Sequence, residues 1–388
     1  MKQILKKAKR RAEHGIFNLF RLFPIKENRI LFESEADLTD NSFAFYDYLS
    51  KESKYISYTL IWLVEPSYKG NKTFIYKWTR GINVKRLYYL ATSKYFFFDH
   101  NNVLSEYPRR NGQRIINLFH GCTFKGSKGG VDNTNTEEMM PVTGDFWKQI
   151  MADFVSCSVD KVQSLGYPRN DYFFKEVNSI QEKWKKEHSW DSYKKVILWM
   201  PTFRKSCNET LSENYYSGIT GLPILEQKEE LGELNEELKK LGNLVVFKVH
   251  HLQADYPAFK EKYSNIQILK DKDINEFGLQ LYQIVPLTDI LITDYSSISN
   301  DYLLMDKPMI FTLDDYETYR SSRGFSVDDP AQYFIGYHVY TKNELIGAIR
   351  ELSDGYDYYK EERKKILPIM HKYQDGNSCK RIADYVGL

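Results

Sequence analysis

Paired cysteines are missing from this sequence of 388 residues. Cys122, Cys157, Cys207 and Cys379 form no CxxC motif and no metal-ligand spacing, and we expect no cleavable secretory signal before them. A reducing cytosol is therefore the natural compartment. No window holds 18 or more consecutive apolar residues either, so we expect no membrane-spanning helix.

A strong net charge is also missing. The chain has 54 Lys and Arg residues against 52 Asp and Glu residues, which gives a formal charge of +2. Nothing in this balance favours a nucleic acid as a partner. The length is that of two domains of about 150 to 200 residues each, so we expect two hydrophobic cores.

The first 30 residues depart from this balance. They carry nine Lys and Arg residues against Glu13 and Glu27. We predict a basic amphipathic helix over residues 1–27 that contacts an anionic membrane surface through residues 1–23. A helix that packs on its own domain is the alternative. The apolar positions on one side of this helix are Ile4, Leu5, Ala8, Ala12, Ile16, Leu19, Phe20 and Phe23.

From Asn28 onward, strand and helix patterns alternate. Strands separated by helices predict parallel pairing in a doubly wound sheet, whose ligands bind at the carboxyl ends of the strands. The expected strands of the first half are 29–33, 58–64, 95–98, 114–119 and 153–157, and the expected helices are 42–49, 84–91 and 159–165.

A polar stretch at 175–194 is expected to form a linker helix between a domain at 28–174 and a domain at 195–388. The second domain repeats the same rhythm. Its expected strands are 195–200, 244–247, 266–269, 290–292 and 308–311, and its expected helices are 225–241, 277–285, 344–352 and 358–373.

The stretch 287–301 predicts a buried strand, a polar turn and a helix. Ser296 and Ser297 lie at the start of that helix, where free N–H groups favour an anion such as a phosphate. Asp294 or a serine acting as a simple helix cap is the alternative.

Polar side chains also follow two neighbouring strands of the second half. Thr202 and Arg204 come after strand 195–200, and Lys248 and His250 come after strand 244–247. Because these strand ends meet at one sheet edge, we expect them to join the serines in a site for a phosphate-bearing ligand.

His120 follows strand 114–119 and precedes Gly121 and a loop that contains Lys125. An imidazole accepts a proton near neutral pH, which suits a general base that activates a hydroxyl. A structural histidine beside a solvated loop is the alternative.

Taken in order along the chain, the motifs at these positions resemble those of the CDP-glycerol glycerophosphotransferase family. This family comprises the teichoic-acid primases and polymerases, together with relatives that build capsular polymers. The resemblance implies a GT-B fold, in which two Rossmann-like α/β domains face each other across a cleft. Residues 28–174 would form the acceptor side, and residues 195–388 the CDP-polyol-binding domain with closing C-terminal helices. The matching motifs are His120-Gly121 with Lys125, 166–171, 201–204, Lys248-Val249-His250, 293–297 with Asp301, Arg323-Gly324-Phe325 and Asp375-Gly376.

The resemblance also implies roles for single residues. His120 matches the presumed base for the acceptor hydroxyl, and His250 matches a second histidine that contacts the donor diphosphate. The positions implied to bind the donor phosphates are Thr202, Arg204, Lys248, Asp294, Ser296, Ser297 and Asp301. The acceptor-side or loop positions are Gly121, Lys125 and Arg169.

This chain also departs from the family. It has Cys122-Thr123 after His120-Gly121, where the family more often has Thr-Pro, and His251 after His250, where the family has Pro. The Pro-Gly that commonly follows the Arg-Gly-Phe segment is absent. These changes leave the polyol of the donor and the acceptor open.

The expected reaction moves glycerol phosphate, or a similar polyol phosphate, from CDP-glycerol or CDP-ribitol to a hydroxyl of a lipid-linked saccharide or growing polymer, and releases CMP. It would serve teichoic-acid or capsular polysaccharide synthesis, in a peripheral protein on the cytoplasmic face of the cell membrane. The length favours a primase-like or compact capsule enzyme over the large polymerases.

No tightly bound metal is expected. A labile Mg²⁺ and the oligomeric state are left open. Two other functions compete with this one: a GT-B glycosyltransferase that uses a nucleotide sugar, and a non-catalytic membrane-docked protein that binds glycans.

Overall fold

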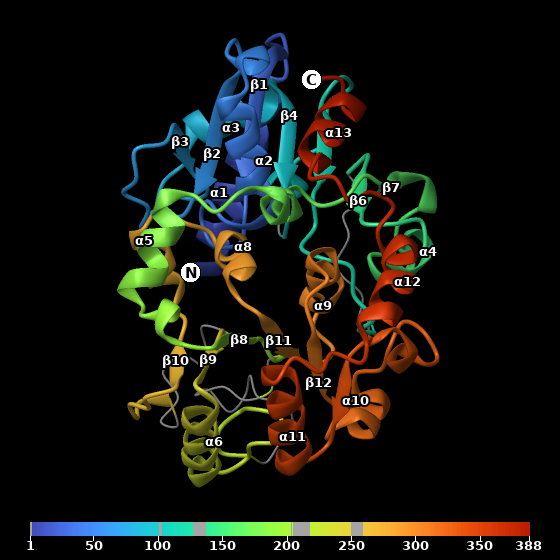
Figure 1. Cartoon of the computed structure of the whole chain (residues 1–388). Helices are drawn as coiled ribbons and strands as arrows, with labels where there is room; N and C mark the ends of the chain where they lie inside the picture. The colour runs from blue at the N-terminus through green and yellow to red at the C-terminus, as the bar shows by residue number, and fades with distance from the viewer. Residues whose placement is uncertain (1, 101–102, 127–136, 203, 205–217, 250–258) are drawn as a thin grey trace. The chain divides into compact units, whose positions relative to one another are not determined.

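The computed structural model describes residues 2–100, 103–126, 137–202, 204, 218–249 and 259–388 (Figure 1). The chain divides into two compact units, and each is described by itself. The first unit comprises residues 1–120, 131–171 and 375–388, and the second comprises residues 121–130 and 172–374. No helix in the described ranges is long and apolar enough to cross a membrane.

The first unit is built on a parallel five-stranded sheet with the order β3-β2-β1-β4-β5. Side chains alternate between its faces, so that Ile30 and Phe32 join one hydrophobic cluster while Leu31 joins the other. Helices therefore cover both faces. The strands are β1 (Lys26–Glu33), β2 (Thr59–Val64), β3 (Phe74–Tyr76), β4 (Ser93–Phe98) and β5 (Arg114–Asn117).

Among the described residues, four helices cover this sheet, two on each face. Helices α2 (Asp40–Lys51) and α13 (Ser378–Tyr385) pack in the cluster that contains Phe32. Helices α1 (Lys2–Phe20) and α3 (Val84–Thr92) pack in the cluster that contains Leu31. Helix α4 (Trp147–Phe154) contacts a small separate sheet of β6 (Met140–Val142) and β7 (Val162–Ser164).

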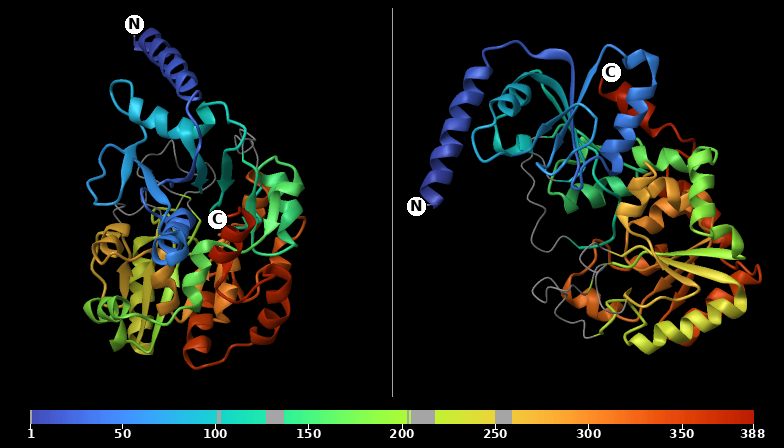
Figure 2. Two further views of the ribbon diagram at one scale, coloured as in Figure 1. Left: turned by 90° about the horizontal axis from the view of Figure 1, so that it is seen from above. Right: turned by 90° about the vertical axis from the view of Figure 1, so that its left-hand side faces the viewer.

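A helix is present within residues 1–27, and it packs in part on its own unit. Phe17 is fully buried, with its ring centroid 4.7 Å from that of Tyr107. Leu19, Leu22 and Phe23 are exposed. Figure 2 shows α1 as the dark blue helix at the N-terminus. Contact with a membrane stays a prediction. The exposed residues Leu19, Leu22 and Phe23, near the end of this helix, are the ones that would make it.

The second unit repeats the same strand order with one strand more, β10-β9-β8-β11-β12-β13, again all parallel. The right-hand view of Figure 2 shows α6 along one side of the yellow strands. The strands are β8 (Lys195–Trp199), β9 (Asn243–Phe247), β10 (Ile266–Ile268), β11 (Ile290–Thr293), β12 (Met309–Thr312) and β13 (Tyr337–Val339).

Helices again cover both faces of this second sheet. One face is covered by α6 (Lys228–Leu241) and α11 (Lys342–Ser353), and the other by α5 (Ser179–Glu187), α7 (Asp271–Glu276) and α8 (Leu281–Ile284). The remaining helices are α9 (Ile298–Tyr302), α10 (Tyr316–Ser322) and α12 (Lys360–Met370).

Two expected elements of the first half are wrong. Residues 153–157 end helix α4 and do not form a strand, because Trp147, Met151 and Val155 recur every four residues and bury one side of a helix. Residues 159–165, expected to be a helix, contain strand β7.

The units also differ from the expected domain boundaries. The stretch 175–194 is no free linker, since Trp184 and Trp190 pack in a hydrophobic cluster of the second unit. Residues 375–388 were expected in the second domain but belong to the first unit. Ile382 and its neighbours on α13 bury their apolar side chains against the first sheet.

Candidate functional site

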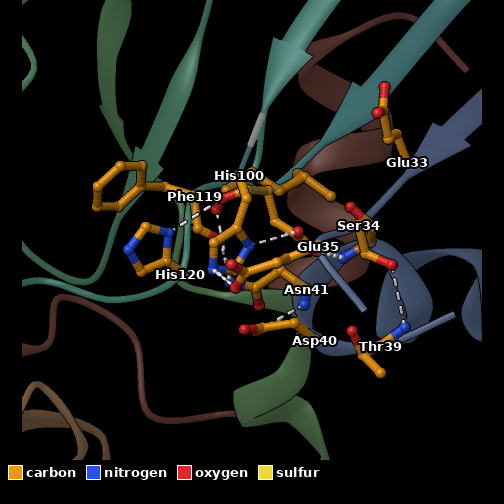
Figure 3. A network of polar contacts seen from close by, with 12 residues as sticks. Glu33, Ser34, Glu35, Thr39, Asp40, Asn41, His100, Phe119 and His120 are labelled. Carbon is orange, nitrogen blue, oxygen red and sulfur yellow. Dashed lines mark hydrogen bonds and ion pairs between the residues drawn. The ribbon is translucent and has the colours of Figure 1, made fainter. Parts of the chain in front are cut away.

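His120 follows strand β5 of the first unit, and its imidazole is held in one orientation (Figure 3). Nδ1 lies 3.1 Å from the backbone oxygen of Asp99. A carbonyl only accepts hydrogen bonds, so Nδ1 carries the proton and Nε2 keeps its lone pair. Burial and the neighbouring His100 lower the pKa of His120 to about 4. The ring is thus neutral at pH 7, the form in which Nε2 accepts a proton.

His100 stacks on His120 but is biased towards the protonated form. The ring centroids are 4.1 Å apart and the planes meet at 10°. His100 Nδ1 lies 2.8 Å from Asp99 Oδ1, and Nε2 lies 3.3 Å from Glu35 Oε2. Burial lowers the pKa of His100, but the hydrogen bond and the charge of Asp99 outweigh burial and raise it. Two touching imidazoles with pKa values pushed apart are typical of acid–base sites.

The backbone on both sides of His120 is fixed by buried polar side chains. Arg169 Nη2 donates to His120 O at 3.0 Å, and Arg169 Nη1 pairs with Asp40 Oδ1 at 2.7 Å. Asn41 Nδ2 donates to Phe119 O at 2.7 Å. Phe119 has a φ of 52°, a left-handed conformation that costs about 1–3 kcal/mol for such a residue. Arg169 and Asn41 are therefore positioning residues, and their hydrogen bonds hold this strained stretch of backbone, and His120 with it, in place.

Gly121 and Lys125 belong to the second unit. Lys125 forms an isolated antiparallel bridge with Phe325, and Gly126 N donates to Gly324 O at 2.8 Å. The structure thus joins the loop after His120 to the Arg-Gly-Phe segment, a contact that the sequence does not reveal.

Asp294 follows β11 in the second unit and is fully buried. Its carboxylate accepts from Thr202 N at 2.8 Å and from Thr202 Oγ1 at 2.6 Å. Arg204 Nη1 donates to the same carboxylate, and Arg204 Nε and Nη2 donate to Asp315 at 2.7 and 3.0 Å. Thr202 and Arg204 therefore meet Asp294, as the strand ends predicted, but inside a closed network.

The expected role of Arg204 as a direct phosphate contact does not fit this network. Its side chain is 0% exposed and is shared between Asp294 and Asp315. Burial opposes the charge, but the two carboxylates outweigh burial and raise the pKa of Arg204. The structure makes Arg204 a positioning residue for the turn after β11.

Ser296 and Ser297 lie half-buried in that turn, directly before α9. Their backbone N–H groups have no acceptor among the residues that the structure describes. Helix α9 spans only five residues, so its macrodipole adds little to these two donors. Asp301 is buried and accepts a hydrogen bond from Tyr282 at 2.6 Å, which places its carboxylate in the interior of the second unit.

Lys248 follows β9, and its Nζ lies 3.2 Å from Asp271 Oδ2. The lysine side chain is 11% exposed and that of Asp271 is 61% exposed. His250 lies outside the described residues. Across the described ranges, no group of three or more His, Cys, Asp or Glu side chains is arranged to hold a metal ion.

Asp99, His100 and Asp315 are site residues that the sequence reasoning missed. Asp99 and His100 directly follow β4, so the strand-end rule that selected His120 also applies to them. Asp315 carries no such signal, because its partner Arg204 lies 111 residues away in the sequence.

Comparison with known proteins gives this geometry a context. The family model described as CDP-Glycerol:Poly(glycerophosphate) glycerophosphotransferase matches residues 16–388. The teichoic acid poly(ribitol-phosphate) polymerase of Bacillus spizizenii is 26% identical over 390 residues, which cover 96% of this chain and 58% of that protein. The teichoic acid ribitol-phosphate polymerase TarK of Staphylococcus aureus is 27% identical, over 95% of this chain and 70% of its own length.

A solved structure is similar over the whole chain. It is a histidine-to-asparagine variant of the wall teichoic acid polymerase TagF soaked with CDPG. It has a TM-score of 0.77 and 19% sequence identity, and the match covers 100% of this chain and 95% of the other. At this identity the likeness shows a shared fold of parallel α/β sheets.

Proposed function

Because the chain belongs to the CDP-glycerol:poly(glycerophosphate) glycerophosphotransferase family, we propose that it transfers a polyol phosphate from a CDP-polyol to an acceptor hydroxyl and releases CMP. The donor is CDP-glycerol or CDP-ribitol. The family description supports glycerol phosphate, and the names of the two polymerases support ribitol phosphate. The CDPG-soaked TagF structure supports a CDP-linked donor.

The observation that carries the proposal is the state of His120. Its Nδ1–H is engaged by Asp99 O, and its Nε2 is unprotonated at pH 7. In the proposed step, Nε2 takes the proton of the acceptor hydroxyl while the oxygen attacks the β-phosphorus. The bond to CMP breaks, and CMP leaves with the electron pair.

The second unit is the proposed donor side. The free N–H groups of Ser296 and Ser297 and the charge of Lys248 stabilise the diphosphate, and His250 assists the leaving CMP. The network of Arg204 with Asp294 holds the turn in shape. Such positioning and charge stabilisation account for most of the catalysis of phosphoryl transfer. The proposal includes a GT-B cleft that brings both units to one donor. It also includes no tightly bound metal, and it leaves a labile Mg²⁺ open.

The proposed acceptor is a lipid-linked saccharide or growing polymer of a teichoic acid or capsule. It would be reached at the cytoplasmic face of the membrane through residues 1–23. Deleting these residues would also remove the buried Phe17, so a surface variant is the cleaner test. Leu19, Leu22 and Phe23, all exposed, are changed together to Ser, and sedimentation with phosphatidylglycerol vesicles is measured. Binding equal to that of the wild type refutes the membrane contact.

The main test is the variant His120→Ala, assayed for CMP release with CDP-glycerol and CDP-ribitol and candidate lipid-linked acceptors. We expect a loss of about 10²- to 10⁴-fold, with donor binding unchanged. His188→Ala is the matched control, since His188 Nδ1 also lies against a backbone oxygen, that of Trp184 at 2.9 Å. Substantial turnover by His120→Ala rejects His120 as the base.

The same assay separates the competing functions. Release of UDP or GDP from a nucleotide sugar identifies a glycosyltransferase. Binding of glycan without turnover of any nucleotide-linked donor identifies a non-catalytic binding protein.

A further inference from the structure

A cavity of about 760 Å³ opens within the first unit. It lies at the carboxyl ends of β1 and β4, which are neighbours in the sheet order β3-β2-β1-β4-β5. From β1 the chain builds the sheet first towards β3 and then, from β4, in the opposite direction, so this is the topological switch point. Parallel sheets bind their ligands at that point, in pockets of about 300–1,000 Å³.

The walls of the cavity carry both signs of charge. Carboxylates of Glu35, Glu65 and Glu106 line it, together with the cations Lys6 and Arg10 of helix α1. Lys6 and Arg10 have no ionic partner in the described part of the chain. Carboxylates accept hydrogen bonds from hydroxyls, and Lys and Arg donate to phosphate oxygens. This lining suits a ligand that carries both groups.

Two further side chains of the lining point to a ligand. Trp78 is 55% exposed and offers a flat apolar face, of the kind that packs against the C–H face of a sugar ring. Arg86 is buried, and its Nε has no hydrogen-bond partner within the described ranges. Buried donors normally have a partner, so the unpaired Nε marks the wall of this cavity as polar and incompletely bonded.

We propose that this cavity binds the phosphorylated saccharide end of the acceptor. Lys6 and Arg10 hold the phosphate, Trp78 holds the sugar ring, and the carboxylates bind its hydroxyls. His100 lines the cavity and stacks at 4.1 Å on His120, so the bound acceptor lies one ring away from the base. The link to the acceptor rests on the proposed function, whereas the binding of a saccharide phosphate does not.

Direct binding tests the ligand class. Glucose 1-phosphate, glucose, inorganic phosphate and glycerol 3-phosphate are titrated into the full chain by calorimetry. We expect saturable binding of glucose 1-phosphate that is at least tenfold tighter than that of glucose or phosphate alone. No saturable binding of glucose 1-phosphate overturns the proposal. Tighter binding of glycerol 3-phosphate overturns the saccharide assignment in favour of the polyol-phosphate chain.

Variants test the location. Trp78→Ala and Arg10→Gln are each expected to weaken glucose 1-phosphate binding about tenfold. Arg11→Gln is the matched control, because Arg11 is the adjacent exposed arginine of α1 and does not line the cavity. It should change binding by less than about twofold. Equal effects of Arg10→Gln and Arg11→Gln overturn the assignment of the cavity.

A kinetic assay then separates this proposal from the proposed function. With a lipid-linked acceptor, Trp78→Ala should raise the acceptor KM about tenfold and leave the CDP-glycerol KM unchanged. If the wild type binds glucose 1-phosphate but releases no CMP, the proposed function fails and the saccharide site stands. If CMP is released and Trp78→Ala leaves the acceptor KM unchanged, the acceptor site in this cavity is rejected and the proposed function is kept.

Discussion

The carboxylate after the fourth strand occupies the same topological place in both units but has different partners. Asp99 follows β4 and accepts a hydrogen bond from the backbone N–H of Ser42, which comes after β1. Asp294 follows β11 and accepts a hydrogen bond from the backbone N–H of Thr202, which comes after β8. Asp99 also bonds to His100, whose charge depends on pH, while Asp294 bonds to Arg204, whose charge is permanent. One strand order thus supports a proton-sensitive edge in one unit and a fixed ion network in the other.

Under the proposed function, this difference gives proton transfer to the first unit and charge placement to the second. The first edge holds groups with displaced pKa values beside a cavity, whereas the second holds a buried guanidinium between two carboxylates. Single substitutions at each edge test this division.

Asp294→Ala is expected to cause the largest loss. It leaves Arg204 buried beside one carboxylate fewer, at a cost of about 3–5 kcal/mol in the unfolding free energy of the second unit. Urea denaturation at pH 7 measures it. The double variant Arg204→Met with Asp294→Leu should lose less, because it leaves no fully buried guanidinium short of a partner, and Asp315, which is 12% exposed, keeps the hydrogen bond from Tyr295. A loss in Asp99→Ala as large as that in Asp294→Ala contradicts the comparison.

Glu33→Gln probes the proton-sensitive edge. Burial raises the pKa of Glu33 to about 8, so the folded protein keeps this carboxyl neutral while the unfolded chain ionises it above pH 4.5. Stability from this group therefore falls as the pH rises from 4.5 to 8. Glu33→Gln should be more stable than the wild type by about 2 kcal/mol or more at pH 8 and similar at pH 4.5. Urea midpoints at the two pH values decide this, with the exposed Glu35→Gln as the control.

His100→Phe keeps the aromatic stack on His120 and removes the charge. His120 must be neutral to accept a proton, so activity falls as the pH drops through its pKa. Without the charge of His100 and with Asp40 still nearby, the pKa of His120 rises. The acid limb of kcat/KM should then move up by about one pH unit. A limb that stays in place shows that burial alone sets the pKa of His120.

Asp271→Asn is expected to have the smallest effect. Asp271 pairs with Lys248, and its own side chain is largely exposed, so the free energy of unfolding should change by less than about 1 kcal/mol. The released lysine charge should tighten CDP-glycerol binding about two- to threefold, as measured by calorimetry. Asp273→Asn, on the same helix, is the control, and tightening in both variants would point to a general charge effect.

The repeating strands and helices were predictable because apolar runs and helical spacing are local signals. The buried strands β1, β2, β8 and β11 all fall where those runs occur. The strand predicted at 153–157 was wrong because a short apolar run fits a strand and the end of a buried helix equally well. Helix α13 was not predicted, since its short polar-rich sequence gains its apolar contacts only from a sheet made much earlier in the chain.

The candidate site was predictable at strand ends and not beyond them. The strand-end rule placed His120, Thr202 and Asp294 at the right edges. It could not tell whether Arg204 would meet a ligand or a carboxylate, because that depends on Asp315 after another strand. The stacking of His100 on His120 likewise arises from the pairing of β4 with β5.

The chain passes between the two units four times, after residues 120, 130, 171 and 374. During synthesis on the ribosome, the sheet of the first unit is therefore made first and completed last. The face of that sheet that carries Phe32 and Phe97 stays partly uncovered until α13 has emerged and brought Ile382 to it. By then the whole second unit has been translated, so His120, the proposed base, reaches its finished surroundings only after the proposed donor side has had time to fold.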